Sequence, residues 1–237
     1  MRITAIKTRL INLPKDNIYD IFDNLKLKNG DILAVTSKIV SIHQGRCVPI
    51  DSVKNKDELI VKESDYYIPR IDVPDKATVL TIKNLNLIAS SGIDENRKAG
   101  YYILLPTKPE KMAKEICQYL KKKFSLKNLG VIVVDSHTSA LKFGVTGFSI
   151  GFFGIEPFKK YFTGNRKEII ASRVNIVDSL AATAVLEMGE QDEQTPLAVI
   201  SEINNLKFTD KETFSQTLMS IKKDIYYPLT KNFIKNK

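Results

Sequence analysis

The residues best suited to chemistry are carboxylates placed where regular segments give way to loops. The apolar run Val131–Val134 reads as a buried strand, and it is followed directly by Asp135 and Ser136. A carboxylate at the end of a buried strand costs free energy unless a partner compensates its charge, and a hard divalent cation is a common partner. Asp135 is therefore a candidate metal ligand. The alternative is that it only caps the following turn, a role that is about as frequent for such aspartates.

Two further acidic positions strengthen the metal interpretation. Asp94 lies in the loop Ser91–Asn96, and Glu190 follows the pair Met188-Gly189. Each of them stands where a regular element meets a glycine-containing loop. Three carboxylates on three loops could hold one or two divalent ions, because such ions prefer oxygen ligands.

Common nucleotide and hydrolase motifs are absent from the sequence. It contains no Gly-x-x-x-x-Gly-Lys-Ser/Thr loop, no Gly-x-Gly-x-x-Gly after a strand and no Gly-x-Ser-x-Gly elbow. The turn Asn12–Lys15 and the segment Thr36–Lys38 could offer backbone amides and a lysine to phosphates, although alone they are ordinary loop residues. Of the two histidines, His43 and His137, the second adjoins Asp135-Ser136 and could touch the site. A loop histidine is more often simply solvated.

The elements that must position these residues form an irregular mixture of strands and helices. Without a strict alternation, the pattern predicts an α+β fold, and no repeat or linker divides residues 1–237, so we expect a single domain. β-Branched enrichment and turn residues at the ends predict strands near Ile3–Ile11, Asp31–Ile42, Thr78–Ala89, Val131–Val134, Gly147–Phe153 and Leu197–Ile203.

Two helices are predicted with defined ends. The first runs over Thr107–Phe124, where Thr107 and Glu110 form a capping box. The second runs over Asp178–Met188 and stops at Gly189. This stop places Glu190 at the mouth of whatever cleft lies there.

Composition narrows the class of protein. The two cysteines, Cys47 and Cys117, have no paired spacing, which argues against a zinc site or a disulfide framework and fits a reducing, cytoplasmic setting. The longest uncharged run, 143–155, is rich in glycine and shorter than the ~20 residues that a helix needs to span a bilayer. The net charge of +9 comes mostly from dispersed lysines. It favours a solvated basic surface over a nucleic-acid-binding face.

Several segments, in order, resemble the coenzyme F420-0:L-glutamate ligase family, the γ-glutamyl ligases that add glutamate to the deazaflavin cofactor. The resemblance covers the chain to about Ile203, and no single motif decides it. The matching stretches are Leu13-Pro14, Gly30–Leu33, Thr36–Ser41, Gly45-Arg46, Ser91–Glu95, Leu104–Pro106, Asp135-Ser136, Gly144 with Thr146, Ile150-Gly151, Asp178–Ala184, Met188–Glu190 and Pro196–Val199.

The resemblance implies a mixed α+β fold assembled as an intertwined homodimer, with two divalent ions, Mg or Mn, and GTP as co-substrate. It implies metal ligation by Asp94, Asp135, Ser136 and Glu190. It implies nucleotide contacts from Leu13, Pro14, Ser37, Lys38, Asn96, Gly189, Gln191 and Thr195.

The chain departs from the family at three places. Ile42 stands where a lysine is usual, and Arg97 where an asparagine is usual. In the family pattern Asp-Thr-x-Gly-Arg-Pro-x-Arg, the two arginines are replaced by Ser139 and Lys142. Planar arginines suit phosphate recognition better than serine or lysine, so this change points away from the phosphodiester of the deazaflavin and toward a folate acceptor. Alternatively, an arginine from elsewhere, such as Arg97 or Arg173, restores the pocket.

The resulting hypothesis is a metal- and GTP-dependent γ-glutamyl ligase. The γ-phosphate would pass to a carboxylate of folate or F420-0, and the amine of L-glutamate would then attack the acyl phosphate. Asp135 and Lys142 are the expected catalytic residues, with Lys142 contacting the acceptor carboxylate. Two alternatives stay open: a catalytically silent relative that binds nucleotide or metal for regulation, and a basic nucleic-acid-binding protein.

Overall fold

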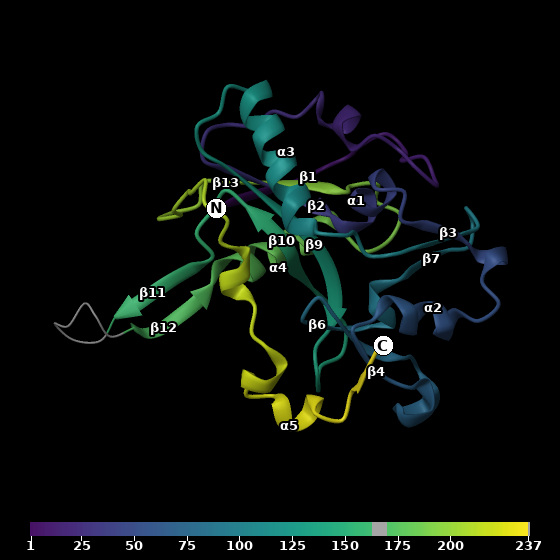
Figure 1. Cartoon of the computed structure of the whole chain (residues 1–237). Helices are drawn as coiled ribbons and strands as arrows, with labels where there is room; N and C mark the ends of the chain where they lie inside the picture. The colour runs from purple at the N-terminus through teal and green to yellow at the C-terminus, as the bar shows by residue number, and fades with distance from the viewer. Residues whose placement is uncertain (163–169, 237) are drawn as a thin grey trace.

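The computed structural model describes residues 1–162 and 170–236. Its centre is a five-stranded mixed sheet in the order β1-β13-β2-β9-β10 (Figure 1). Only β2 and β9 run parallel, and the other neighbours are antiparallel. The strands are β1 (Arg2–Ile6), β2 (Asp31–Thr36), β9 (Leu129–Thr138), β10 (Val145–Phe153) and β13 (Leu197–Ser201).

Both faces of this sheet are buried, because successive side chains on a strand point to opposite sides. On β2, Leu33 and Val35 pack toward α3 (Pro109–Lys123). The intervening Ile32 and Ala34 pack toward α4 (Ile176–Met188). The same alternation holds on β9. It explains why the central strands read as nearly continuous apolar runs.

Residues 47–103, together with the last described strand, build a second unit that we call the accessory lobe. Its own core contains Ile60, Val79 and Tyr102. It holds a three-stranded sheet, β3-β8-β7, and a four-stranded sheet, β14-β4-β5-β6. The elements are β3 (Cys47–Pro49), α2 (Lys56–Glu63), β4 (Tyr66–Ile68), β5 (Leu80–Lys83), β6 (Asn86–Ala89), β7 (Asp94–Asn96), β8 (Tyr101–Ile103) and β14 (Ile234–Lys235).

Two further parts extend from the main sheet (Figure 1). A ribbon of β11 (Phe158–Phe162) and β12 (Ile170–Asn175) projects from the body. The C-terminal segment leaves β13, passes through α5 (Tyr227–Thr230) and reaches the accessory lobe, where β14 pairs with β4. The remaining helical turns are α1 (Ser37–His43) and the 3-10 turns Ile18–Phe22, Ile50–Ser52, Arg70–Asp72, Pro74–Lys76, Ser90–Gly92, Phe214–Thr217 and Ile221–Lys223.

The predicted α+β class is confirmed, and so is the helix ending at Gly189, which has a φ of 81°. That helix begins two residues earlier than predicted, because the side chain of Asn175 accepts a hydrogen bond from the backbone N–H of Asp178. Within the described residues, no helix is long and apolar enough to cross a membrane.

Four local predictions were wrong. The strand predicted over Val131–Val134 runs from Leu129 to Thr138, because its pairing with β10 continues through Asp135 and Ser136, so both residues lie within the strand and not after its end. The run 31–42 is a strand only to Thr36 and then turns into α1. The run 78–89 is a hairpin, because Asn84 and Leu85 adopt positive φ angles that reverse the chain. The first strand, expected to reach Ile11, ends at Ile6.

The prediction of a capping box formed by Thr107 and Glu110 was also wrong. Helix α3 starts after Lys108, which has a left-handed backbone and makes no side-chain cap. Thr107 is engaged elsewhere, since its backbone N–H donates to Oε1 of Gln44 at 2.8 Å and its hydroxyl to the same atom at 3.3 Å.

Candidate functional site

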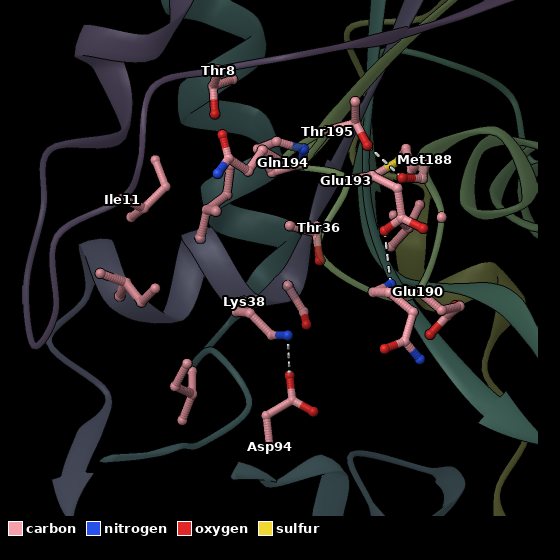
Figure 2. Close-up of a pocket in the computed structure, with 18 of the residues that line it drawn as sticks. Thr8, Ile11, Thr36, Lys38, Asp94, Met188, Glu190, Glu193, Gln194 and Thr195 are labelled. Atoms are coloured by element: carbon pink, nitrogen blue, oxygen red, sulfur yellow. Dashed lines mark hydrogen bonds and ion pairs between the residues drawn. The ribbon is translucent and has the colours of Figure 1, made fainter. Parts of the chain in front are cut away.

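A polar pocket of about 310 Å³ lies at the end of β2 and beside residues 134–136 of β9, between α1, β7, the loop after α4 and the segment that follows β1. Figure 2 shows side chains from these segments facing one another across it. Neither Pro14 nor Lys142 lines the pocket. The predicted residues that do line it are Leu13, Ser37, Lys38, Asp94, Asn96, Asp135, Ser136, Gly189, Glu190, Gln191 and Thr195.

Strand alternation explains how β9 serves two sides of the pocket. Asp135 continues the row of Val131 and Val133, which faces α3 and α1, whereas Ser136 continues the row that faces α4. One carboxylate oxygen of Asp135 accepts the backbone N–H of Ser136 at 2.7 Å. Burial raises the pKa of Asp135 to about 7, with the negative charge of Asp94 adding to the increase, while hydrogen bonds from Ser37 and Ser136 oppose it.

Asp94 enters the pocket from the accessory lobe. On β7 the side chains of Asp94 and Asn96 line the pocket, while Glu95 between them does not. Glu95 instead binds Nζ of Lys56 at 2.6 Å and Nε of Arg97 at 2.7 Å, and these contacts lower its pKa. Arg97 is 86% exposed and does not line the pocket, so it does not restore an arginine there in this conformation. Asp94 lies 3.0 Å from Nζ of Lys38.

Glu190 closes the opposite side of the pocket. It accepts a hydrogen bond of 3.1 Å from the Ser136 hydroxyl, which links the loop after α4 to the end of β9. The loop is internally braced, because Glu193 accepts the backbone N–H of Gln191 at 2.8 Å and the Thr195 hydroxyl donates to the carbonyl of Met188. The acidic residue therefore sits on a loop with a defined shape.

The pocket has a fourth wall that the sequence analysis missed. Arg9 lines it and forms a two-pronged ion pair with Asp16, with N···O distances of 2.6 and 2.8 Å. Asp16 also accepts the backbone N–H groups of Asn12 and Asn17, and its pKa falls well below the usual range, chiefly because of Arg9. The only signal in the sequence was an arginine and an aspartate seven residues apart across the Leu-Pro turn.

The turn between β9 and β10 lies outside the pocket. Lys142 is exposed there and does not line the cavity. His137 packs against the ring of Phe148, with centroids 4.4 Å apart, so it is neither fully solvated nor a pocket residue. Arg173 lies on β12, opposite Lys160, and does not line the pocket either.

The donors of the pocket suit a hard divalent cation in type. Carboxylates of Asp94, Asp135 and Glu190 and the hydroxyl of Ser136 are all oxygen ligands. In the described part of the chain, however, no three His, Cys, Asp or Glu side chains form a group able to hold a metal ion. The acids share one cavity, with Asp94 paired to Lys38 and Glu190 bound to Ser136.

The protein thus has an α+β fold with an acidic, lysine-containing pocket beside its main mixed sheet. The family profile F420-0:Gamma-glutamyl ligase matches residues 5–202. The chain belongs to this family. It is an enzyme of a ligase family that forms γ-glutamyl amide bonds.

Curated relatives agree with the family match. The Coenzyme F420:L-glutamate ligase of Methanopyrus kandleri is 28% identical over 221 residues, covering 84% of this chain and 86% of the relative. The enzyme of the same name from Methanosarcina barkeri is 28% identical and covers 91% of this chain and 87% of its own. That from Methanocaldococcus jannaschii is 26% identical and covers 79% and 82%.

Proposed function

We propose that this chain is a metal- and nucleotide-dependent γ-glutamyl ligase, with GTP as co-substrate and residues 1–237 acting as one catalytic unit. The observation that carries the proposal is the pocket itself, which gathers carboxylates, a lysine and small polar loops from five separate parts of the chain. Family membership supports the γ-glutamyl ligation.

The chemistry proceeds in two displacements. An acceptor carboxylate oxygen attacks the γ-phosphorus of the nucleotide and the nucleoside diphosphate leaves. The free amine of L-glutamate then attacks the acyl carbon, phosphate leaves, and the amide forms as the amine loses a proton. One or two Mg²⁺ or Mn²⁺ ions would offset the charge of the transferring phosphoryl group. The ligands that the resemblance implies, Asp94, Asp135, Ser136 and Glu190, share the pocket but would have to move closer together to hold an ion.

The protein's own residues supply binding and orientation. Lys38 provides a positive charge beside the acids, and Ser37 hydrogen-bonds to Asp135. The loop of Gly189, Gln191 and Thr195 and the turn at Leu13 offer backbone groups for the nucleotide. Recognition of phosphates by backbone amides needs no P-loop.

Two molecules, F420-0 and folate, are candidates for the acceptor. The names of the curated relatives favour F420-0. The replacement of two family arginines by Ser139 and Lys142 favours folate, which carries a terminal glutamate carboxylate without a phosphodiester. Because Lys142 lies outside the pocket, its contact with an acceptor requires either an acceptor that extends toward the β9–β10 turn or a movement of that turn.

The decisive experiment incubates purified protein with L-glutamate, GTP or ATP, Mg²⁺ or Mn²⁺, and either acceptor, and records the product masses. A product from F420-0 alone would exclude folate, and the reverse result would exclude F420-0. Nucleotide or metal binding without any product would support the catalytically silent alternative.

We also propose a homodimer. Leu141 and Phe143 at the tip of the β9–β10 turn are fully exposed, and an apolar pair at such a position is better explained by a covering partner than by solvent. Light scattering on the purified protein measures the mass directly, and a monomer at micromolar concentration would refute the proposal.

A further inference from the structure

A second cavity, which we call the edge pocket, lies along the outer strand of the main sheet. Its volume is about 170 Å³, and its lining includes Phe148 and Ser149 of β10, Asp178 of α4 and Phe214 of the C-terminal segment. It shares Phe152 and Phe214 with a neighbouring cavity of about 440 Å³. The two cavities therefore adjoin, and a ligand can extend from one into the other.

The edge pocket lies one strand away from the polar pocket. In the register of β9 and β10, Phe148 pairs with Asp135 and Ser149 pairs with Val134. Val134 and Asp135 line the polar pocket. Because neighbouring strands are about 4.8 Å apart, the two cavities are separated by roughly 10 Å at the same level of the sheet. A molecule with a ring at one end and a reacting carboxylate at the other is long enough to reach both.

The walls of the edge pocket suit a flat ring. Phe148 and Phe152 are buried there. The ring of Phe214 meets that of Phe152 edge to face, with centroids 5.7 Å apart and an interplanar angle of 77°. Aromatic side chains offer large apolar surfaces to a second flat ring, in stacked or edge-to-face contact.

Asp178 adds a carboxylate to these aromatic walls. One of its oxygens accepts the backbone N–H of Ser149 at 3.0 Å, and the other accepts the side-chain amide of Asn175. Both donors are neutral, and burial raises the pKa of Asp178. An ionised carboxylate has about four lone-pair sites, so each oxygen can accept one more hydrogen bond. Two adjacent N–H donors on a ligand would match these free sites.

We propose that the edge pocket binds the ring of the acceptor, and that Asp178 selects an aminopyrimidinone edge, as in a pterin, whose ring N–H and amino group are adjacent donors. The inference rests on the proposed function, because the ring belongs to the molecule that receives glutamate. A deazaflavin has a pyrimidinedione edge, in which a carbonyl oxygen replaces the amino group. That oxygen is an acceptor and repels the carboxylate. The site therefore favours folate over F420-0.

One wall of the edge pocket comes from outside the family match. Phe214, Thr217, Leu218 and Asp224 line the cavity, and all of them follow residue 202, where the match ends. This part of the chain is therefore free to give the ring site a preference that differs from the acceptor named for the curated relatives.

The test uses isolated rings, so it needs no metal, nucleotide or glutamate. Pterin and lumazine are matched fluorescent probes, because lumazine carries an oxo group in place of the amino group of pterin. Their affinities for the full-length protein are measured by fluorescence titration. We expect the wild type to bind pterin at least about tenfold more tightly than lumazine, the scale of a hydrogen bond to a charged group. Asp178→Asn should lose most of this preference.

Two further variants separate the paired contact from other effects. Asp224→Asn removes the same charge from the same cavity, but Asp224 accepts the backbone N–H of Tyr226, so the preference should persist. Phe214→Leu removes an aromatic wall and should weaken both probes alike. Asparagine at position 178 can still accept the N–H of Ser149, and melting temperatures verify that each variant is folded. An equal loss of preference in Asp224→Asn would show a general charge effect and overturn the role of Asp178.

The failure of this inference differs from the failure of the proposed function. If the wild type binds neither ring, or binds both equally, while the product assay shows glutamate added to an acceptor, the ring site is wrong and the ligase stands. If pterin binding depends on Asp178 and neither acceptor yields a product, the ring site stands and the ligase function is contradicted.

Discussion

Asp135 is the residue whose replacement is most informative. Burial disfavours its charged form, yet the carboxylate has defined partners in the pocket. Its carboxylate lies within β9, near Asp94, and accepts the backbone N–H of Ser136. Removing its charge relieves the burial of an ionised group, so the folded state should lose little.

We predict that Asp135→Asn folds with a melting temperature equal to or above that of the wild type and loses at least about a hundredfold in turnover, the scale of losing one key electrostatic group. Circular dichroism and the mass-based product assay measure the two quantities. Near-normal activity in this variant would show that Asp135 takes no part in catalysis.

The lowered pKa of Asp16 predicts how the stability of the protein depends on pH. Arg9 and two backbone N–H groups hold its folded pKa below the unfolded value of 3.8. A lowered carboxyl pKa stabilises the folded state at pH values above the unfolded pKa, and that contribution is lost as the pH falls through the folded pKa. The free energy of unfolding of the wild type should therefore fall more steeply below pH 4 than that of Asp16→Asn. Urea titrations between pH 3 and 6 test this, and parallel curves would contradict it.

At the scale of elements, the loop after α4 depends on a backbone conformation that only glycine adopts readily. Gly189 has φ of 81° and ψ of 171°, and a Cβ atom there would lie 2.4 Å from Cδ of Glu193. Glu193 in turn holds the N–H of Gln191. The shape of the loop that presents Glu190 is thus set by one residue.

We predict that Gly189→Ala loses on the order of 1–3 kcal/mol of stability, the usual cost of such a strained conformation. The apparent affinity for nucleotide should fall as well, because the braced loop must shift. Leu180→Ala serves as a comparison, since it removes buried packing on α4 at a residue that does not line the pocket and leaves the loop backbone unchanged. An unchanged nucleotide affinity in Gly189→Ala would mean that this loop does not contact the nucleotide.

Local patterns predicted the elements whose apolar period or stop signal lies within the element itself. The helix ending at Gly189 and the strands carrying Val131–Val134 and Leu197–Ser201 could be read from periodicity and stop signals. Helix α1 could not, because its β-branched residues favour a strand on their own, and Ile39 and Val40 become helical through burial in the main core.

Long-range contacts account for the other differences. Thr107 does not cap α3 as predicted, because it binds the side chain of Gln44, which lies sixty-three residues away in the sequence. The pocket acids were identified because each interrupts an apolar or glycine-rich pattern, whereas Arg9 follows no such interruption. Its place in the pocket depends on pairing between Thr8 and Gln194, whose N···O distance is 3.1 Å, and on Asp16. No local signal encodes that pairing.

At the scale of the whole molecule, the site is divided between the main sheet and the accessory lobe. Asp135, Ser136 and Glu190 belong to the body, while Asp94 and Asn96 arrive on β7. The attachment of the lobe should therefore influence the site. One attachment is Asn236, whose side-chain amide donates to the carbonyls of Val61 and Ser64 at 2.8 and 3.0 Å.

We predict that Asn236→Ala destabilises the accessory lobe by roughly 1–2 kcal/mol, because two hydrogen bonds are lost. Hydrogen exchange should quicken in residues 61–68 while the strands of the main sheet keep their protection. Lys231→Ala, elsewhere in the same segment, is the comparison. Uniform exchange across both sheets would show that the lobe and the body open together.

The pairing of β14 with β4 also bears on how fast the native structure is reached. The bond from Asn236 to Val61 spans 175 residues, whereas the β5–β6 hairpin closes over a two-residue turn. Contacts of such different sequence separation form on different timescales, because a long loop loses more chain entropy on closing. During refolding, the inner strands of that sheet should form first and its outer strand last, which leaves the edge of β4 open for pairing with other chains in the interval.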